Sequence, residues 1–248
     1  MTAFFPLFRK EISFFFFTPV AYAVGFFFLL STGFGLWSTA GNLAQKGADD
    51  PLASLLFGSP AYWLAMAILC PLLTMGLFSE ERRRNTLETL LTAPVSETEV
   101  VLAKYFGALC AFVVLWLPTL AYGSILSASG ISVDPADWGP VWSGYLGTAL
   151  VGAFFLAAGL LCSLLARHQA IAAVASLAVL GSLVFAGSPW VHIPLEDARA
   201  AFLWISPWNH VSAFASGVFD SRTILWYASA TALALFLSVR CLEARRLR

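Results

Sequence analysis

Residues 61–78 read AYWLAMAILCPLLTMGLF, and none of these 18 consecutive side chains carries a charge. A helix of about 17–25 mainly apolar residues is long enough to cross the hydrocarbon core of a bilayer. Five more runs of this kind lie at residues 20–37, 105–126, 142–165, 170–187 and 224–239. Their apolar residues are not confined to alternate positions, as they would be in barrel strands. The sequence therefore predicts an all-α, polytopic membrane protein with six transmembrane helices.

The composition excludes several other classes of protein. Of the 248 residues, 59% are apolar and only 11% are charged, whereas an ordinary soluble domain is about 25% charged. So few charges cannot cover a water-facing surface, so a soluble enzyme is not expected. The 14 basic and 14 acidic residues balance, which leaves no basic field to attract nucleic acid. The four cysteines have no metal-binding spacing, and we expect them to pack as small apolar residues.

The basic residues predict how the chain is oriented. If the N-terminus is cytoplasmic and all six runs cross, 11 of the 14 lysines and arginines fall on the cytoplasmic side. Only Lys46, Arg199 and Arg222 then lie outside. Cytoplasmic loops of membrane proteins carry such an excess of positive charge. Both termini are therefore predicted to be cytoplasmic, and residues 1–248 are predicted to form a single transmembrane domain.

Two segments outside the six runs have a distinct character. Residues 1–18 mix Arg9, Lys10 and Glu11 with many phenylalanines, which predicts a helix lying at the cytoplasmic interface. The alternative is a signal peptide cleaved near Ser38-Thr39-Ala40, but the apolar run before it is longer than a signal core.

Residues 198–219 are apolar, but Pro207, Asn209 and His210 interrupt their middle. A seventh span here would move the arginine-rich C-terminus outside, against the charge distribution. We therefore expect residues 188–222 to form an outer re-entrant region of short helices, shielded by protein. The His210 side chain is expected to cap a short helix or to hydrogen-bond a backbone carbonyl left unpaired at the helix break there. The candidate site residues of this region are Pro207, His210, Gly217, Asp220 and Arg222.

The long cytoplasmic loop, residues 79–99, begins SEERRRNTLETLLTAP. Its leucines fall at i, i+3 and i+4, which predicts a short amphipathic helix that Pro94 ends. Arg84 and Glu88 are spaced to pair at i, i+4, and Ser96 with Glu99 predicts a capping box at the start of the third span. This helix is either a membrane-surface anchor or a lever that a partner protein grips; the residues alone leave both open.

Two stretches of this sequence resemble a known family. The run Glu81-Arg82 through residues 86–91 to Ala93-Pro94 resembles the signature of ABC-2-type transporter permeases. A second set of residues, in and around the re-entrant region, resembles the pattern of one branch of this family. That branch contains the gliding-motility permease GldF and the NosY-type permeases. That set is Ser206, Pro207, His210, Phe214, Gly217, Asp220, Arg222 and Tyr227. This branch often has aspartate after the arginine, where this sequence has Thr223.

The resemblance implies a permease subunit of an ATP-driven exporter in a bacterial inner membrane. Such a subunit dimerises with a second copy or a paralogue and binds separate ATP-binding subunits. The residues it implies for coupling to the ATPase are Glu81, Arg82, Thr86, Leu87, Glu88, Leu90 and Leu91. None of the three lysines ends a G-x-x-x-x-G-K-[ST] loop. We therefore expect no bound cofactor and no enzymatic activity in this chain, with ATP and magnesium on the partner.

The sequence also bears on two other functions of membrane proteins. An intramembrane protease of the CAAX type would need arginine where Asn85 stands, and no G-x-S-G element for a rhomboid nucleophile is present. The alternative is a membrane anchor or scaffold that recruits an ATPase-driven machine without moving a solute. The middles of the six runs lack charged residues, which disfavours a proton-coupled carrier or an ion channel and favours a lipid-like substrate.

Overall fold

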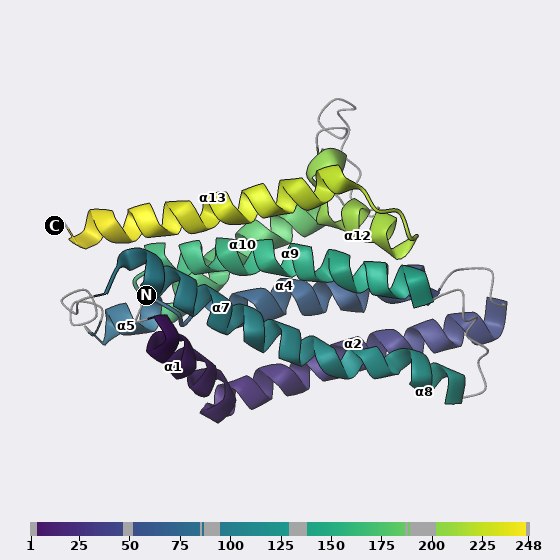
Figure 1. Ribbon diagram of the computed structural model, residues 1–248. Helices are drawn as coiled ribbons and strands as arrows, with labels where there is room; N and C mark the ends of the chain where they lie inside the picture. Colours follow the sequence, from purple (N-terminus) through teal and green to yellow (C-terminus); the bar gives the residue numbers. More distant parts are fainter. Residues whose placement is uncertain are drawn as a thin grey trace.

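The computed structural model describes residues 4–46, 52–84, 86, 95–128, 138–186, 188 and 202–246. Within these residues every regular element is a helix. Figure 1 shows long helices running side by side as one bundle. The start of the chain, α5 and the C-terminal end of the last helix lie at one end of the bundle, and α8 and α12 lie toward the other. The all-helical prediction is confirmed for the described part of the chain.

Five helical stretches among the described residues are long and apolar enough to cross a membrane. They are α2 (Pro19–Lys46), α4 (Pro60–Thr74) with α5 (Ser79–Arg83), α7 (Glu97–Trp116) with its extension, α9 (Trp138–Leu165) and α13 (Ser221–Arg246). The extension of α7 consists of the 3₁₀ segment η1 (Leu117–Ala121) and α8 (Tyr122–Ala128). The remaining predicted span corresponds to α10 (Gln169–Ala186), a shorter apolar helix that packs against α9 and α4.

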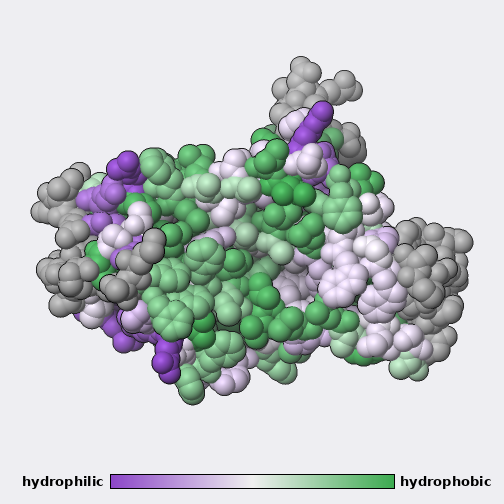
Figure 2. Space-filling view, viewed as in Figure 1, coloured by the Kyte–Doolittle hydropathy of each residue, from purple (hydrophilic) through white to green (hydrophobic). Residues whose placement is uncertain are grey.

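Side chains on the surface are distributed as a bilayer requires. Figure 2 shows hydrophobic residues over the middle of the visible face and hydrophilic ones mainly at the end carrying α5 and near the α12–α13 connection. Large apolar side chains are exposed along α2, α10 and α13. Contiguous exposed apolar surface of this extent would be covered by lipid. The chain is therefore a multi-pass membrane protein.

The central helix of the bundle is α9, which contacts α4, α7, α10, α12 and α13. Close packing around it depends on glycines that leave room for neighbouring side chains. A Cβ atom built on Gly152 would come within 2.3 Å of the Phe112 ring, and one on Gly159 within 2.2 Å of Thr74 Oγ1. Small residues allow helices in membranes to approach in this way.

We expect Gly152→Ala to destabilise the bundle because the buried Phe112 ring must move to accommodate the new methyl group. Overpacking a core costs about 1–3 kcal/mol, measurable as a lower unfolding temperature in detergent. The matched control is Gly181→Ala on α10, where nothing lies within 4 Å of the added Cβ. Equal unfolding temperatures for the two variants would contradict this account of the packing.

Two short elements lie outside the predicted spans. One is α3 (Leu52–Phe57), which buries Leu52, Ala53 and Phe57. The predicted N-terminal helix is present as α1 (Phe4–Phe17), and it packs along α7 with Glu11 buried. Only its exposed phenylalanines remain free to contact lipid.

Candidate functional site

The end of the second span is fixed to α9 by one hydroxyl group. The backbone N–H groups of Phe78 and Ser79 donate to Ser163 Oγ at 3.2 and 3.3 Å, and this hydroxyl donates to the Met75 carbonyl at 3.0 Å. Ser79 and Ser163 are fully buried. These bonds satisfy backbone groups at the break between α4 and α5, and thereby set where α5 begins.

The start of the third span is fixed by the predicted capping box, which is confirmed. Ser96 Oγ accepts from the Glu99 backbone N–H at 3.3 Å, and the Glu99 carboxylate accepts from the Ser96 N–H at 3.3 Å. Two of the orphan donors at the helix start are thus satisfied reciprocally. The register of α7 follows from this, and it places Lys104 on the side that faces α1 and α5.

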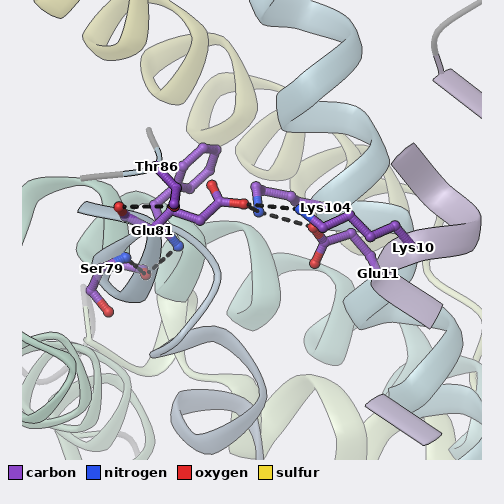
Figure 3. Close-up of polar contacts among 8 residues, drawn as sticks. Lys10, Glu11, Ser79, Glu81, Thr86 and Lys104 are labelled. Atoms are coloured by element: carbon purple, nitrogen blue, oxygen red, sulfur yellow. Dashed lines mark hydrogen bonds and ion pairs between the residues drawn. The ribbon is translucent and has the colours of Figure 1, made fainter. Parts of the chain in front are cut away.

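Lys104 is the centre of a buried ion cluster (Figure 3). Its Nζ donates to Glu11 Oε1 of α1 at 3.0 Å and to Glu81 Oε1 of α5 at 2.9 Å. The side chains of Lys104, Glu11 and Glu81 are 4%, 9% and 17% exposed. A single ammonium group therefore joins three helices at the end of the bundle that carries the long loop.

The surroundings of this cluster hold the ions in place. The Phe78 ring lies 5.1 Å from Lys104 Nζ in a cation–π contact, and Lys10 Nζ lies 3.6 Å from Glu81 Oε1 at the surface. A Cβ on Gly107 would come within 2.8 Å of Glu11 Cβ, so this glycine allows α1 to approach α7. Glu81 Oε2 is buried and has no hydrogen-bond partner among the residues that the structure describes.

The other predicted coupling residues separate into two groups. Arg82 Nη1 donates to the Ala166 carbonyl at 3.3 Å, and the exposed Thr86 hydroxyl donates to the Glu81 carbonyl at 3.3 Å. The remaining four, Leu87, Glu88, Leu90 and Leu91, lie outside the described residues.

Arg84 forms its i, i+4 ion pair with Glu80 at 2.6 Å, on its N-terminal side. The pairing expected from the sequence was with Glu88, which lies outside the described residues. Since Glu80 is also 4.0 Å from Arg83, this half-buried carboxylate pairs with two arginines, whereas Glu81, the next residue, pairs with Lys104.

Glu11 and Lys104 were not among the candidate site residues predicted from the sequence. Lys104 was counted only as a basic residue flanking the third span, and Glu11 only as part of a mixed interfacial segment. A lone lysine one to two turns inside an apolar helix was the available signal. Its partners are 93 and 23 residues away, so no local spacing rule relates them.

The second predicted group lies on and after α12 (Pro207–Ala215), with Ser206 at the N-cap and Pro207 in the first turn. His210 Nδ1 is 3.0 Å from the Tyr227 hydroxyl, a contact that joins α12 to α13. Burial lowers the pKa of His210, opposed by the Trp204 carbonyl and the Asp220 charge. The neutral imidazole therefore serves as a packing and hydrogen-bonding group.

The end of α12 is a Schellman motif with Gly217 at φ +78°. The Gly217 N–H donates to the Phe214 carbonyl at 2.9 Å and the Val218 N–H donates to the Ala213 carbonyl at 3.1 Å. Asp220 then accepts from the Arg222 N–H at 2.9 Å and caps the start of α13.

Within the residues that the structure describes, no three histidine, cysteine or acidic side chains are grouped so as to hold a metal ion. The charged groups that come together are instead those of the Lys104 cluster, which fix three helices relative to one another.

A family model described as "ABC-2 family transporter protein" matches residues 39–242. The match covers the elements from α3 to α13, including Glu81 and Lys104, and begins after α1. A comparison with curated proteins gives no match. The family model covers most of the chain and agrees with the bundle of apolar helices. The chain therefore belongs to the ABC-2 transporter family and is an ABC transporter permease.

Proposed function

We propose that this permease is the membrane subunit of an ATP-driven exporter whose ATP and magnesium are bound by a separate subunit. It would act as a dimer with a second copy or a paralogue, in a bacterial inner membrane. The residues around α12 and Asp220 favour the branch with GldF and the NosY-type permeases. We take α10 as the sixth span, because it is apolar and lies in the bundle beside α9 and α4.

The observation that carries this proposal is the bonding of Lys104 to both Glu81 and Glu11. Residues 79–99 connect the second span to the third, and Glu81 lies at the start of this connection. A partner that displaces the loop would therefore act on α4 directly and on α7 and α1 through Lys104. The partner must bind one state of the permease more tightly than the other to shift their populations.

The substrate that fits this arrangement is a lipid-like or lipid-linked amphiphile. In the described spans the charged residues lie near the helix ends, as with Lys104 in α7 and Arg222 and Arg240 in α13. A path for a hydrated ion would require polar or charged groups at membrane depth.

Transport by the reconstituted complex tests the proposed function. Proteoliposomes containing the permease and the ATP-binding subunit that co-purifies with it should move a fluorescent amphiphile when ATP is supplied. A complex whose ATP-binding subunit carries a substituted P-loop lysine is the control. ATP hydrolysis without movement of any amphiphile or ion would favour the scaffold instead.

The proposed topology predicts which residues are reached from outside the cell. In a variant lacking the four native cysteines, a membrane-impermeant maleimide should label Ser216→Cys in intact cells. Arg83→Cys and Ala244→Cys should be labelled only after lysis, because α5 and the end of α13 lie at the same end of the bundle (Figure 1). All three positions are exposed in the structure. Labelling of Ala244→Cys in intact cells would mean an odd number of spans.

A further inference from the structure

Arg82 lies within electrostatic reach of two arginines from distant parts of the chain. Arg82 lies on α5, Arg167 in the turn between α9 and α10, and Arg245 near the end of α13. Arg82 Nη1 donates to the carbonyl of Ala166 at 3.3 Å, next to Arg167. The positive charges of Arg245 and Arg167 both act on the Arg82 guanidinium.

These three arginines differ from their neighbours in having no acidic partner within the part of the chain that the structure describes. Among the described residues no carboxylate lies within 4.0 Å of any of them, whereas Arg84 is paired with Glu80 at 2.6 Å and Arg240 with Glu243 at 2.8 Å. A guanidinium offers five N–H donors, and Arg82 uses one of them on Ala166. Three neighbouring positive charges that no described carboxylate neutralises favour an anion beside them.

Two large apolar side chains close to Arg167 in the chain are exposed. Leu165 and Ile171, one on each side of Arg167 in the chain, are both exposed, and they belong to helices that face lipid. Figure 2 shows hydrophilic residues at this end bordering directly on hydrophobic ones. An anion with an attached hydrocarbon chain matches both the arginines and the exposed apolar side chains. A soluble anion matches only the arginines.

We propose that Arg82, Arg167 and Arg245 bind the phosphate group of an anionic phospholipid whose acyl chains lie over Leu165 and Ile171. Basic pockets between helices on the cytoplasmic side are suited to such headgroups, and arginine can bind phosphate oxygens in a bidentate manner. The proposal rests on the cytoplasmic placement of this end, which is part of the proposed function, but it requires neither ATP nor transport. An occupied site would tie α5 to α9 and α13.

The test compares two variants with the same change in net charge. Arg82→Gln/Arg167→Gln/Arg245→Gln removes the site, and Arg83→Gln/Arg84→Gln/Arg240→Gln is the matched control at the same end of the bundle. Phosphatidylglycerol or cardiolipin is titrated into phosphatidylcholine micelles holding the purified permease, and lipid binding is followed by native mass spectrometry and by the unfolding temperature. We expect binding to be at least tenfold weaker in the site variant and unchanged in the control.

Arg167→Gln alone is the second variant, because this exposed side chain forms no hydrogen bond or ion pair with the described residues. It should weaken lipid binding several-fold. Equal weakening in the control variant would overturn the proposal in favour of general charge attraction. Equal stabilisation by inorganic phosphate would overturn it in favour of a soluble anion. Unchanged lipid binding together with loss of the ATP-binding subunit from the site variant would assign the arginines to that protein instead. Failure of transport would leave the lipid measurement unaffected.

Discussion

Replacing Lys104 with methionine is expected to lower the free energy of unfolding by about 3–5 kcal/mol, the cost of removing one partner from a buried ion pair. Methionine fills most of the space of the lysine stem but leaves two carboxylates, Glu11 and Glu81, without the ammonium that neutralises them. For a chain of this size each kcal/mol shifts the unfolding temperature by roughly 2–4 °C. The unfolding temperature of the variant in detergent should therefore be lower by on the order of 10 °C.

The matched control for this prediction is Lys10→Met. Lys10 lies 3.6 Å from the same Glu81 oxygen, but its side chain is 63% exposed, and exposed ion pairs contribute about 0–1 kcal/mol. Adding Glu11→Gln and Glu81→Gln to Lys104→Met should recover part of the lost stability, because no unpaired charge then remains buried. A Lys10→Met variant as unstable as Lys104→Met would show that burial does not set the strength of these pairs.

The features that sequence patterns predicted well are those that depend on neighbouring residues. Long apolar runs gave the spans, and the spacing of Ser96 and Glu99 gave the capping box. Residues 170–187 met the same hydropathy criterion, but α10 is shorter than the five helical stretches that are long enough to cross a membrane. The short α3 was missed because its six residues are fewer than any hydropathy or periodicity pattern requires.

The candidate site was predicted only in part, because its bonds connect residues far apart in the chain. Glu81 was identified by resemblance, but its partner Lys104 lies on the next span and Glu11 on the first helix. Nothing in the local pattern distinguishes Glu81 from Glu80, although one carboxylate is held inward by Lys104 and the other pairs with Arg84 at the surface. The position of Lys104 on α7, opposite Glu81, accounts for this difference.

Glu81→Gln is expected to reduce ATP-driven transport about tenfold while the complex still assembles. Glutamine keeps the size of the side chain and can still accept a hydrogen bond from Lys104, so the bundle should fold. Its lost charge weakens the link between the loop and α7, and a change of about 1.4 kcal/mol in coupling free energy corresponds to a factor of ten. The measurement is the ratio of substrate-stimulated to basal ATP hydrolysis, together with amphiphile transport, in proteoliposomes.

The control for Glu81→Gln is Glu80→Gln, the adjacent carboxylate that pairs with exposed Arg84. It removes the same charge from the same short helix but leaves Lys104 bonded to Glu81 and Glu11. If Glu81 acts through Lys104, only Glu81→Gln should lower the stimulation ratio, and a Lys104→Met complex stable enough to purify should lower it as well. Equal ratios for the two glutamine variants would show that Glu81 and Lys104 stabilise the fold without transmitting movement of the loop.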